Sequence, residues 1–266
     1  MVMEYRKIEV STNNGVAFIE LNSPENFNAI TPELSQDLIG ALERCNTDSE
    51  IRVIILSAKG KSFCSGGDLK AFNQYLISDT TIKIGSDIRL ASNIVRSIRR
   101  VRVPVICAIH GSAAGAGANL ALMCDFKIAS EDAKFIEAFI NVALVPDMGG
   151  IYALSKHIGM AKLNEVMMLG EPISAQEALS CGMINQVVPR DKLESAAIAL
   201  AEKLVSKPTL ALQKIKRLVN QTLFDRLDAI LETEEEYQVM CASSSDFQEG
   251  VTSFLEKRKP IFNAQT

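Results

Sequence analysis

The first two thirds of the chain alternate short apolar runs with segments in which apolar residues recur every three or four positions. Apolar runs typical of strands occupy residues 16–21, 53–57, 104–109 and 126–129. A helical period spans residues 84–100, and its apolar face is formed by Ile88, Ala91, Ile94, Val95 and Ile98. Strands that alternate with helices through short loops predict an α/β architecture.

Helix signals divide the chain into two regions. Thr31 is a suitable N-cap and Pro32 suits the first turn of a helix. From about residue 191 the pattern is almost purely helical, and Pro208 separates two of the helices. We predict an α/β core at residues 1–195 and a helical region at residues 196–266. No Pro/Gly/Ser-rich linker joins them, so the helical region is expected to pack on the core.

One stretch of this helical region, ETEEE at residues 232–236, is strongly acidic. Charge runs of this kind are usually the solvated face of a helix, which is the interpretation adopted here.

Composition excludes several classes of protein. Hydrophobic residues make up 47% and charged residues 23% of the 266 residues, as in ordinary globular proteins, and the net charge of −4 lacks the basic excess typical of nucleic-acid binding. The six cysteines form no C-x-x-C pair, so we expect small buried thiols and no metal site. No secretory signal and no membrane span are predicted, and the expected location is cytoplasmic.

A first glycine-rich loop, GKSFCSGGDLKAF, follows the second apolar run and occupies residues 60–72. It is not a P-loop, because Ile55 stands where that motif requires glycine. Consecutive Gly66 and Gly67 let the backbone approach a ligand and turn its N–H groups outward. The same pattern also suits a simple tight turn, and the loop alone does not decide between the two.

A second loop, GSAAGAGAN, follows the third apolar run and occupies residues 111–119. Gly115 and Gly117 begin a dinucleotide fingerprint, but Leu120 takes the place of its third glycine, so a nicotinamide site is not expected. Small residues here bring the start of a helix close to a ligand. Free N–H groups at a helix start suit a developing oxyanion.

Together with ENFNAI at residues 25–30, segments 103–125 and 133–150, and FLEKRK at residues 254–259, these loops resemble the enoyl-CoA hydratase/isomerase (crotonase) superfamily along nearly the whole chain. The resemblance implies a spiral of ββα units with a C-terminal helical region used in trimer formation. Such trimers often pair into hexamers, so a homotrimer or a dimer of trimers is expected.

The resemblance also implies the substrate site. The N–H groups of Gly67 and Ala116 correspond to the pair that binds the thioester carbonyl. Positions expected along coenzyme A are Ala29, Ser65, Gly66, Asp68, Leu69 and Lys70, and the nucleotide end is expected at Phe254 and Lys257, often those of a neighbouring subunit. Coenzyme A enters as part of the substrate, and no separate cofactor is expected.

The chain departs from the hydratase pattern at both glutamates that activate water. Asn119 and Phe139 stand at those positions and are expected to line the substrate site. Neither can exchange protons at neutral pH. Glu137 is near in sequence, but in a regular segment it would point to the opposite face.

One carboxylate stays well placed, Asp147 in the loop VPDMGG. Isomerase and dehalogenase members of the superfamily hold an essential acid in this loop, although an N-cap for the following helix would explain the residue too. The sequence most resembles the branch that contains 1,2-epoxyphenylacetyl-CoA isomerase and Δ3,Δ2-enoyl-CoA isomerases. Dehalogenases also need a histidine at the position of Ser92, and His110 is interpreted as structural.

The resulting hypothesis is an enoyl-CoA isomerase in which Gly67 and Ala116 stabilise an enolate while Asp147 carries the proton. Three alternatives stay open: an enoyl-CoA hydratase with another base, a ring isomerase of epoxyphenylacetyl-CoA, and a non-catalytic acyl-CoA-binding subunit.

Overall fold

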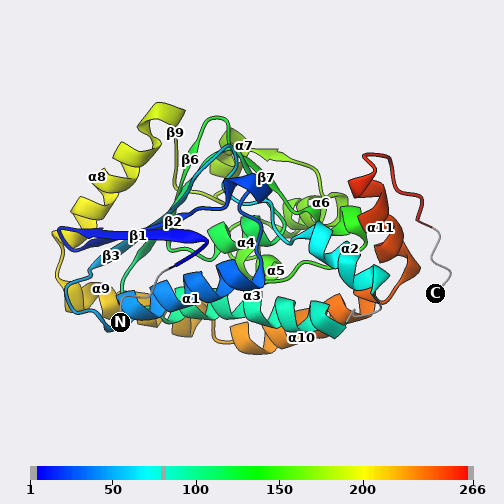
Figure 1. The fold of residues 1–266 in the computed structure, drawn as a ribbon. Coiled ribbons are helices and arrows are strands. Elements are labelled where there is room, and N and C mark those ends of the chain that lie inside the picture. The colour runs from blue at the N-terminus through cyan, green and yellow to red at the C-terminus, as the bar shows by residue number, and fades with distance from the viewer. Residues whose placement is uncertain (1–4, 79–81, 263–266) are drawn as a thin grey trace.

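The fold is a twisted β-sheet with helices on both faces, continued by a helical C-terminal region (Figure 1). The computed structural model describes residues 5–78 and 82–262. The strands are β1 Ile8–Asn13, β2 Val16–Leu21, β3 Val53–Ala58, β4 Val105–Ile109, β5 Ser112–Ala114, β6 Phe126–Ser130, β7 Lys134–Ile136, β8 Ile173–Ser174 and β9 Gln186–Val188. The helices of the core are η1 Pro24–Asn26, α1 Pro32–Thr47, α2 Leu69–Ile77, α3 Ile82–Arg100, α4 Ala116–Leu122, η2 Ala138–Val142, α5 Gly150–Leu154, α6 Met160–Leu169, α7 Ala175–Ser180 and η3 Arg190–Lys192. The C-terminal helices are α8 Leu193–Val205, α9 Thr209–Leu223, α10 Leu227–Ala242 and α11 Ser245–Leu255.

The main sheet has six strands in the order β1-β2-β3-β4-β6-β9. The pair β1–β2 is antiparallel, and every other pair of neighbouring strands in this sheet is parallel. Parallel strands put their carboxyl ends at one edge of the sheet. Both glycine-rich loops follow such ends, because one comes after β3 and the other after β4, and these strands are neighbours.

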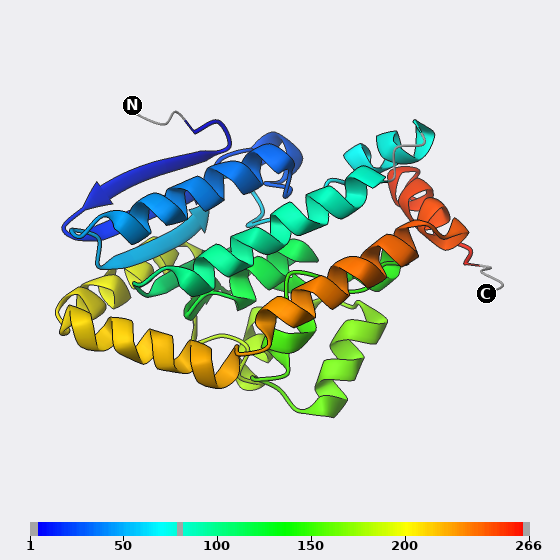
Figure 2. The ribbon, with the colours of Figure 1, turned by 90° about the horizontal axis from the view of Figure 1, so that it is seen from below.

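Helices bury both faces of this sheet, which explains the nearly continuous apolar sequences of its central strands β3 and β4. On one face α8 packs over β3, β4 and β6, with Ala197 and Ala201 in a small core. On the other face α1 and α3 cover the main core, and α10 lies along α3 (Figure 2). The predicted packing of the C-terminal helices on the core is therefore observed.

Several elements begin where the sequence predicts. The Thr31 hydroxyl accepts a hydrogen bond from the Leu34 N–H at 3.2 Å and caps α1. The four apolar runs form β2, β3, β4 and β6, and Pro208 separates α8 from α9. The predicted boundary between the α/β core and the helical region, at residues 195 and 196, falls within α8 and stays a prediction.

A second, three-stranded sheet in the order β5-β7-β8 stands beside the start of α4. Its strands are two or three residues long, and the apolar pattern does not reveal them. The β5–β7 pair holds the second glycine-rich loop against the segment that continues into η2.

Candidate active site

The first glycine-rich loop is fixed by backbone pairing with the segment before α1. The Ile30 N–H donates to the Gly66 carbonyl at 2.8 Å, and Ile30 and Gly67 form a parallel bridge. This pairing uses the Gly66 carbonyl and leaves the Gly67 N–H on the other edge of the loop. Gly66 has a φ of +86°, a conformation that favours glycine.

The second loop presents the start of α4. Gly115, with a φ of +50°, precedes the helix, and Ala116 is its first residue. The first N–H groups of a helix have no partner within it. Ala116 therefore offers a donor at this end of α4.

Tight contacts hold the two loops together. Cys64 and Ala113 form a parallel bridge, and the Ala114 N–H donates to the Cys64 carbonyl at 2.9 Å. A Cβ atom at Gly66 would lie only 2.6 Å from the Ala114 carbonyl oxygen and 3.3 Å from the Ala116 nitrogen. Among residues 5–78 and 82–262, no hydrogen bond uses the N–H of Gly67 or of Ala116. The fold thus brings two free donors to adjoining loops, as expected of a site that stabilises an oxyanion.

The residues expected along coenzyme A lie in the first glycine-rich loop, at the start of α2 and in the segment before α1. Ala29 is buried, whereas Ser65 and Lys70 are exposed. The Asp68 carboxylate caps α2 by accepting hydrogen bonds from the Lys70 and Ala71 N–H groups at 3.0 and 3.2 Å. Leu69, the first residue of α2, packs against the core.

The C-terminal helix α11 packs against α2 (Figure 2). The ring centroids of Phe72 and Phe247 lie 6.2 Å apart. Phe254 lies near the end of α11 and is 60% exposed. Lys257 follows the helix and is also exposed. Contact of either residue with a ligand stays a prediction.

Asp147 lies buried in the loop before α5. Its Oδ2 accepts a hydrogen bond from Gln238 Nε2 at 3.2 Å, and its Oδ1 has no partner. Burial raises the pKa of this carboxyl to about 7. The cap of α5 is Gly149, so the N-cap interpretation of Asp147 is wrong.

The two positions that lack glutamate lie on α4 and η2. Asn119 is fully buried on α4, one turn after Ala116, and its Nδ2 donates to the Asp147 carbonyl oxygen at 2.8 Å. The ring of Phe139 is buried and lies beside Gly115, where an added Cβ would be 3.7 Å away. Asn119 therefore ties the Asp147 loop to the helix that carries the Ala116 donor, and Phe139 forms an apolar wall next to it.

Two further carboxyls, which the sequence did not indicate as site residues, complete a buried cluster. Glu137 is 2% exposed, and neither of its carboxylate oxygens has a hydrogen-bond partner. Burial, with the Asp147 charge next in weight, raises the pKa of Glu137 to about 8. The expectation that Glu137 points away is therefore wrong, because the irregular η2 segment replaces the regular strand on which it rested.

Glu234 belongs to the acidic run of α10, and its Oε2 accepts a hydrogen bond from the Gly149 N–H at 2.8 Å. Burial raises its pKa to about 8, and Asp147 adds to the shift. The interpretation of this run as a solvated face is wrong for Glu234. Its helical register with the buried residues Leu231 and Gln238 is the signal that reveals it.

Among the described residues, no group of three His, Cys, Asp or Glu side chains is arranged to hold a metal.

His110 and Ser92, which are not expected to be catalytic, both lie in the protein interior. His110 is buried, and its Nε2 lies 3.2 Å from the Gly60 carbonyl oxygen. Ser92 is buried on α3, and its Oγ has no hydrogen-bond partner. Cys45, Cys64, Cys107 and Cys124 are buried free thiols, as expected, whereas Cys181 and Cys241 are only partly buried, so the expectation of buried thiols is wrong for these two.

The raised carboxyl pKa values make stability depend on pH. Between about pH 5 and 8 the folded protein holds protons that the unfolded chain has lost, so the free energy of unfolding falls as pH rises. Glu137→Gln imitates the protonated carboxyl, and it should flatten this fall by on the order of 1 kcal/mol or more. Urea unfolding at several pH values measures the effect, with exposed Glu232→Gln as the control. A slope unchanged by Glu137→Gln would contradict a raised pKa.

The fold and the adjoining amides are the features expected of enzymes that hold a thioester oxygen between two backbone donors. The enoyl-CoA hydratase/isomerase family model matches residues 11–265, and the chain belongs to this family, whose members act on acyl-CoA thioesters. Its crotonase-like fold, expected from the sequence, is confirmed.

Some relatives are named isomerases and others hydratases. The chain is 38% identical over 251 residues to a 1,2-epoxyphenylacetyl-CoA isomerase of Escherichia coli, covering 94% of this chain and 96% of the relative. It is 32% identical to a trans-2-decenoyl-[acyl-carrier-protein] isomerase of Streptococcus mutans, covering 99% and 100%. A solved enoyl-CoA hydratase of Mycobacterium avium subsp. paratuberculosis superposes with a TM-score of 0.89 at 30% identity, covering 98% of this chain and 100% of that one. No helix among the described residues is long and apolar enough to cross a membrane.

Proposed function

We propose that this chain is an enoyl-CoA isomerase that moves a double bond by proton transfer. The thioester oxygen of a 3-enoyl-CoA accepts hydrogen bonds from the Gly67 and Ala116 N–H groups. Asp147 removes a proton from the α-carbon, and the negative charge moves to the thioester oxygen as an enolate. The protonated Asp147 returns the proton at the γ-carbon, which gives the 2-enoyl-CoA without net oxidation. Coenzyme A enters as part of the substrate, and no separate cofactor is proposed.

The observation that carries this proposal is the buried Asp147 carboxyl, tied through Asn119 to the helix that presents the Ala116 N–H. A carboxyl with a pKa near 7 exchanges protons readily at neutral pH in both directions. Its Oδ1 has no hydrogen-bond partner among the described side chains, which suits an atom that takes a proton from a substrate.

The same residues weigh against hydration as the main reaction. Hydration must position and activate water, and apolar Phe139 occupies one of the positions that serve this purpose in hydratases of the superfamily. The second candidate is ring isomerisation of an epoxyphenylacetyl-CoA, favoured by the 38% identity to the Escherichia coli enzyme of that name. Both isomerisations would use the same two amides.

Purified protein offered 3-hexenoyl-CoA, crotonyl-CoA and 1,2-epoxyphenylacetyl-CoA distinguishes these functions. We expect conversion of 3-hexenoyl-CoA to the 2-enoyl isomer, followed by the rise in ultraviolet absorbance of the conjugated thioester. Rapid hydration of crotonyl-CoA with no isomerisation would reject the proposal. Binding of all three thioesters without turnover would favour a non-catalytic subunit.

We further propose that the enzyme is cytoplasmic and assembles as a homotrimer or a dimer of trimers. The C-terminal helices expose an apolar surface, on which Ile215, Leu218, Val219 and Leu223 of α9 are between 39% and 61% exposed. Exposed apolar surfaces of this kind are typical of subunit contacts.

Light scattering should therefore report three or six chains per particle. Leu218→Glu puts a charge into this surface and is expected to shift the protein toward monomers, whereas Gln221→Glu, which places the same charge elsewhere on α9, should not. A monomeric wild-type protein would contradict the assembly.

A further inference from the structure

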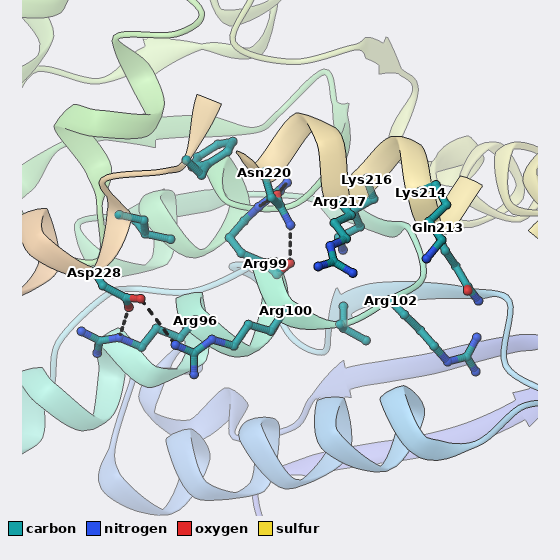
Figure 3. Close-up of a pocket in the computed structure, with 13 residues that line it drawn as sticks. Arg96, Arg99, Arg100, Arg102, Gln213, Lys214, Lys216, Arg217, Asn220 and Asp228 are labelled. Atoms are coloured by element: carbon teal, nitrogen blue, oxygen red, sulfur yellow. Dashed lines mark hydrogen bonds and ion pairs between the residues drawn. The ribbon is translucent and has the colours of Figure 1, made fainter. Parts of the chain in front are cut away.

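A cavity of about 470 Å³ lies between the end of α3 and the helix α9, bounded by the start of α10 (Figure 3). Seven of the side chains that line it are Lys or Arg, and one, Asp228, is acidic. The whole chain has a net charge of −4, so this concentration of positive charge is local. None of the lining residues belongs to the two glycine-rich loops or to the Asp147 cluster.

Two of the cations have a structural role at the base of the cavity. Arg99 and Lys216 form ion pairs with the partly buried Asp125 carboxylate, at 3.0 and 2.7 Å. Lys216 Nζ also donates to the carbonyl oxygens of Ile98 and Val103. These contacts join α3 to α9 and hold the walls of the cavity in place.

The other cations are only partly neutralised. Arg96 and Arg100 share a single carboxylate, Asp228, at 2.7 and 3.5 Å. Lys214 and Arg217 are exposed, and neither side chain forms a hydrogen bond or ion pair with a described residue. In Figure 3 the Arg217 side chain extends from α9 toward the end of α3.

Arg102 is the remaining cation of the lining. Its guanidinium donates hydrogen bonds to backbone carbonyl oxygens, including that of Ile51 at 3.0 Å, and it forms no pair with a carboxylate among the described residues. After Asp125 and Asp228 are counted, the cavity retains an excess of five positive charges.

We propose that this cavity is a binding site for a small multivalent phosphate anion, of the class of nucleoside polyphosphates. Arginine side chains bind phosphate oxygens through paired N–H groups, and a concave surface of one charge concentrates its field on the ligand. The volume lies in the range of small-molecule sites. Val101, Phe224 and Leu227 supply an apolar part of the lining, which suits the organic portion of such an anion. The proposal does not depend on the isomerase function.

Calorimetry with the full chain tests the site, using ATP and inorganic pyrophosphate as probes. We expect one ATP to bind per chain, with an affinity that falls as salt is added. The double variant Lys214→Gln/Arg217→Gln should weaken ATP binding at least tenfold, while Lys203→Gln on α8, which removes an exposed charge elsewhere, should not. Circular dichroism checks that each variant is folded, and both changed residues are exposed.

Several results would overturn the proposal. One is the absence of binding by either probe at millimolar concentration and low salt. Another is equal weakening by the double variant and by Lys203→Gln, which would mean non-specific attraction. The third is weakening by Lys257→Gln in place of the double variant, or displacement of ATP by saturating acyl-CoA, because these would assign ATP to the coenzyme A site. Binding of an acidic carrier protein without binding of either probe would also reject it.

Discussion

Replacing Asp147 by asparagine is expected to lower the rate of 3-hexenoyl-CoA isomerisation about 10²- to 10⁴-fold, the usual contribution of a general acid–base. Asparagine keeps the shape of the side chain and an oxygen that can accept the Gln238 hydrogen bond, but it cannot carry a proton. The backbone carbonyl that Asn119 contacts is unchanged. Substrate affinity should therefore change little while kcat falls.

The pH profile of the wild-type enzyme supplies a second readout. Proton removal requires the ionised carboxylate, so kcat/KM should rise with pH and level off above about pH 7, where burial places the Asp147 pKa. The residual activity of Asp147→Asn should lack this step. A variant that isomerises at the wild-type rate, or keeps the same pH step, would show that another group carries the proton.

Sequence and structure agree where local pattern decides the conformation. The Thr31 cap, the apolar runs and the long helix before Pro104 follow from spacing and residue type, and they recur in α1, in the main sheet and in α3. Small residues mark the two glycine-rich loops in the sequence, because only they permit the close approach seen at Gly66. Motifs of this kind can be recognised from the sequence alone.

The buried carboxyl cluster was not predictable in the same way. Glu137 sits in a segment whose direction depends on an irregular 3-10 turn, and Glu234 joins Asp147 from almost ninety residues further along the chain. Charged residues usually face solvent, so an acidic run suggests an exposed face. Only the helical register of Glu234 with Leu231 and Gln238 opposes that interpretation, and the register becomes persuasive once the apolar stripe of α10 is known.

The second large effect is expected from a substitution at Gly66, where the two glycine-rich loops meet. Gly66→Ala would place a Cβ atom 2.6 Å from the Ala114 carbonyl oxygen in a backbone conformation with φ near +86°. The Ala114 oxygen belongs to the backbone and cannot rotate aside, so the loops must separate. We expect a loss of about 1–3 kcal/mol of stability from the backbone strain. Separation of the Gly67 and Ala116 donors should also lower kcat by on the order of 10²-fold, as the loss of one oxyanion donor does.

Gly159→Ala is the matched control, because a Cβ at Gly159 meets nothing within 4 Å and the residue has a φ of −72°. It should leave kcat near the wild-type value. Thermal unfolding separates the two consequences, since Gly66→Ala must be assayed well below its melting temperature. A folded Gly66→Ala protein with wild-type kcat would mean that the two amides do not act together on the thioester oxygen. The isomerase mechanism would then lose its enolate stabilisation, even if Asp147 proved essential.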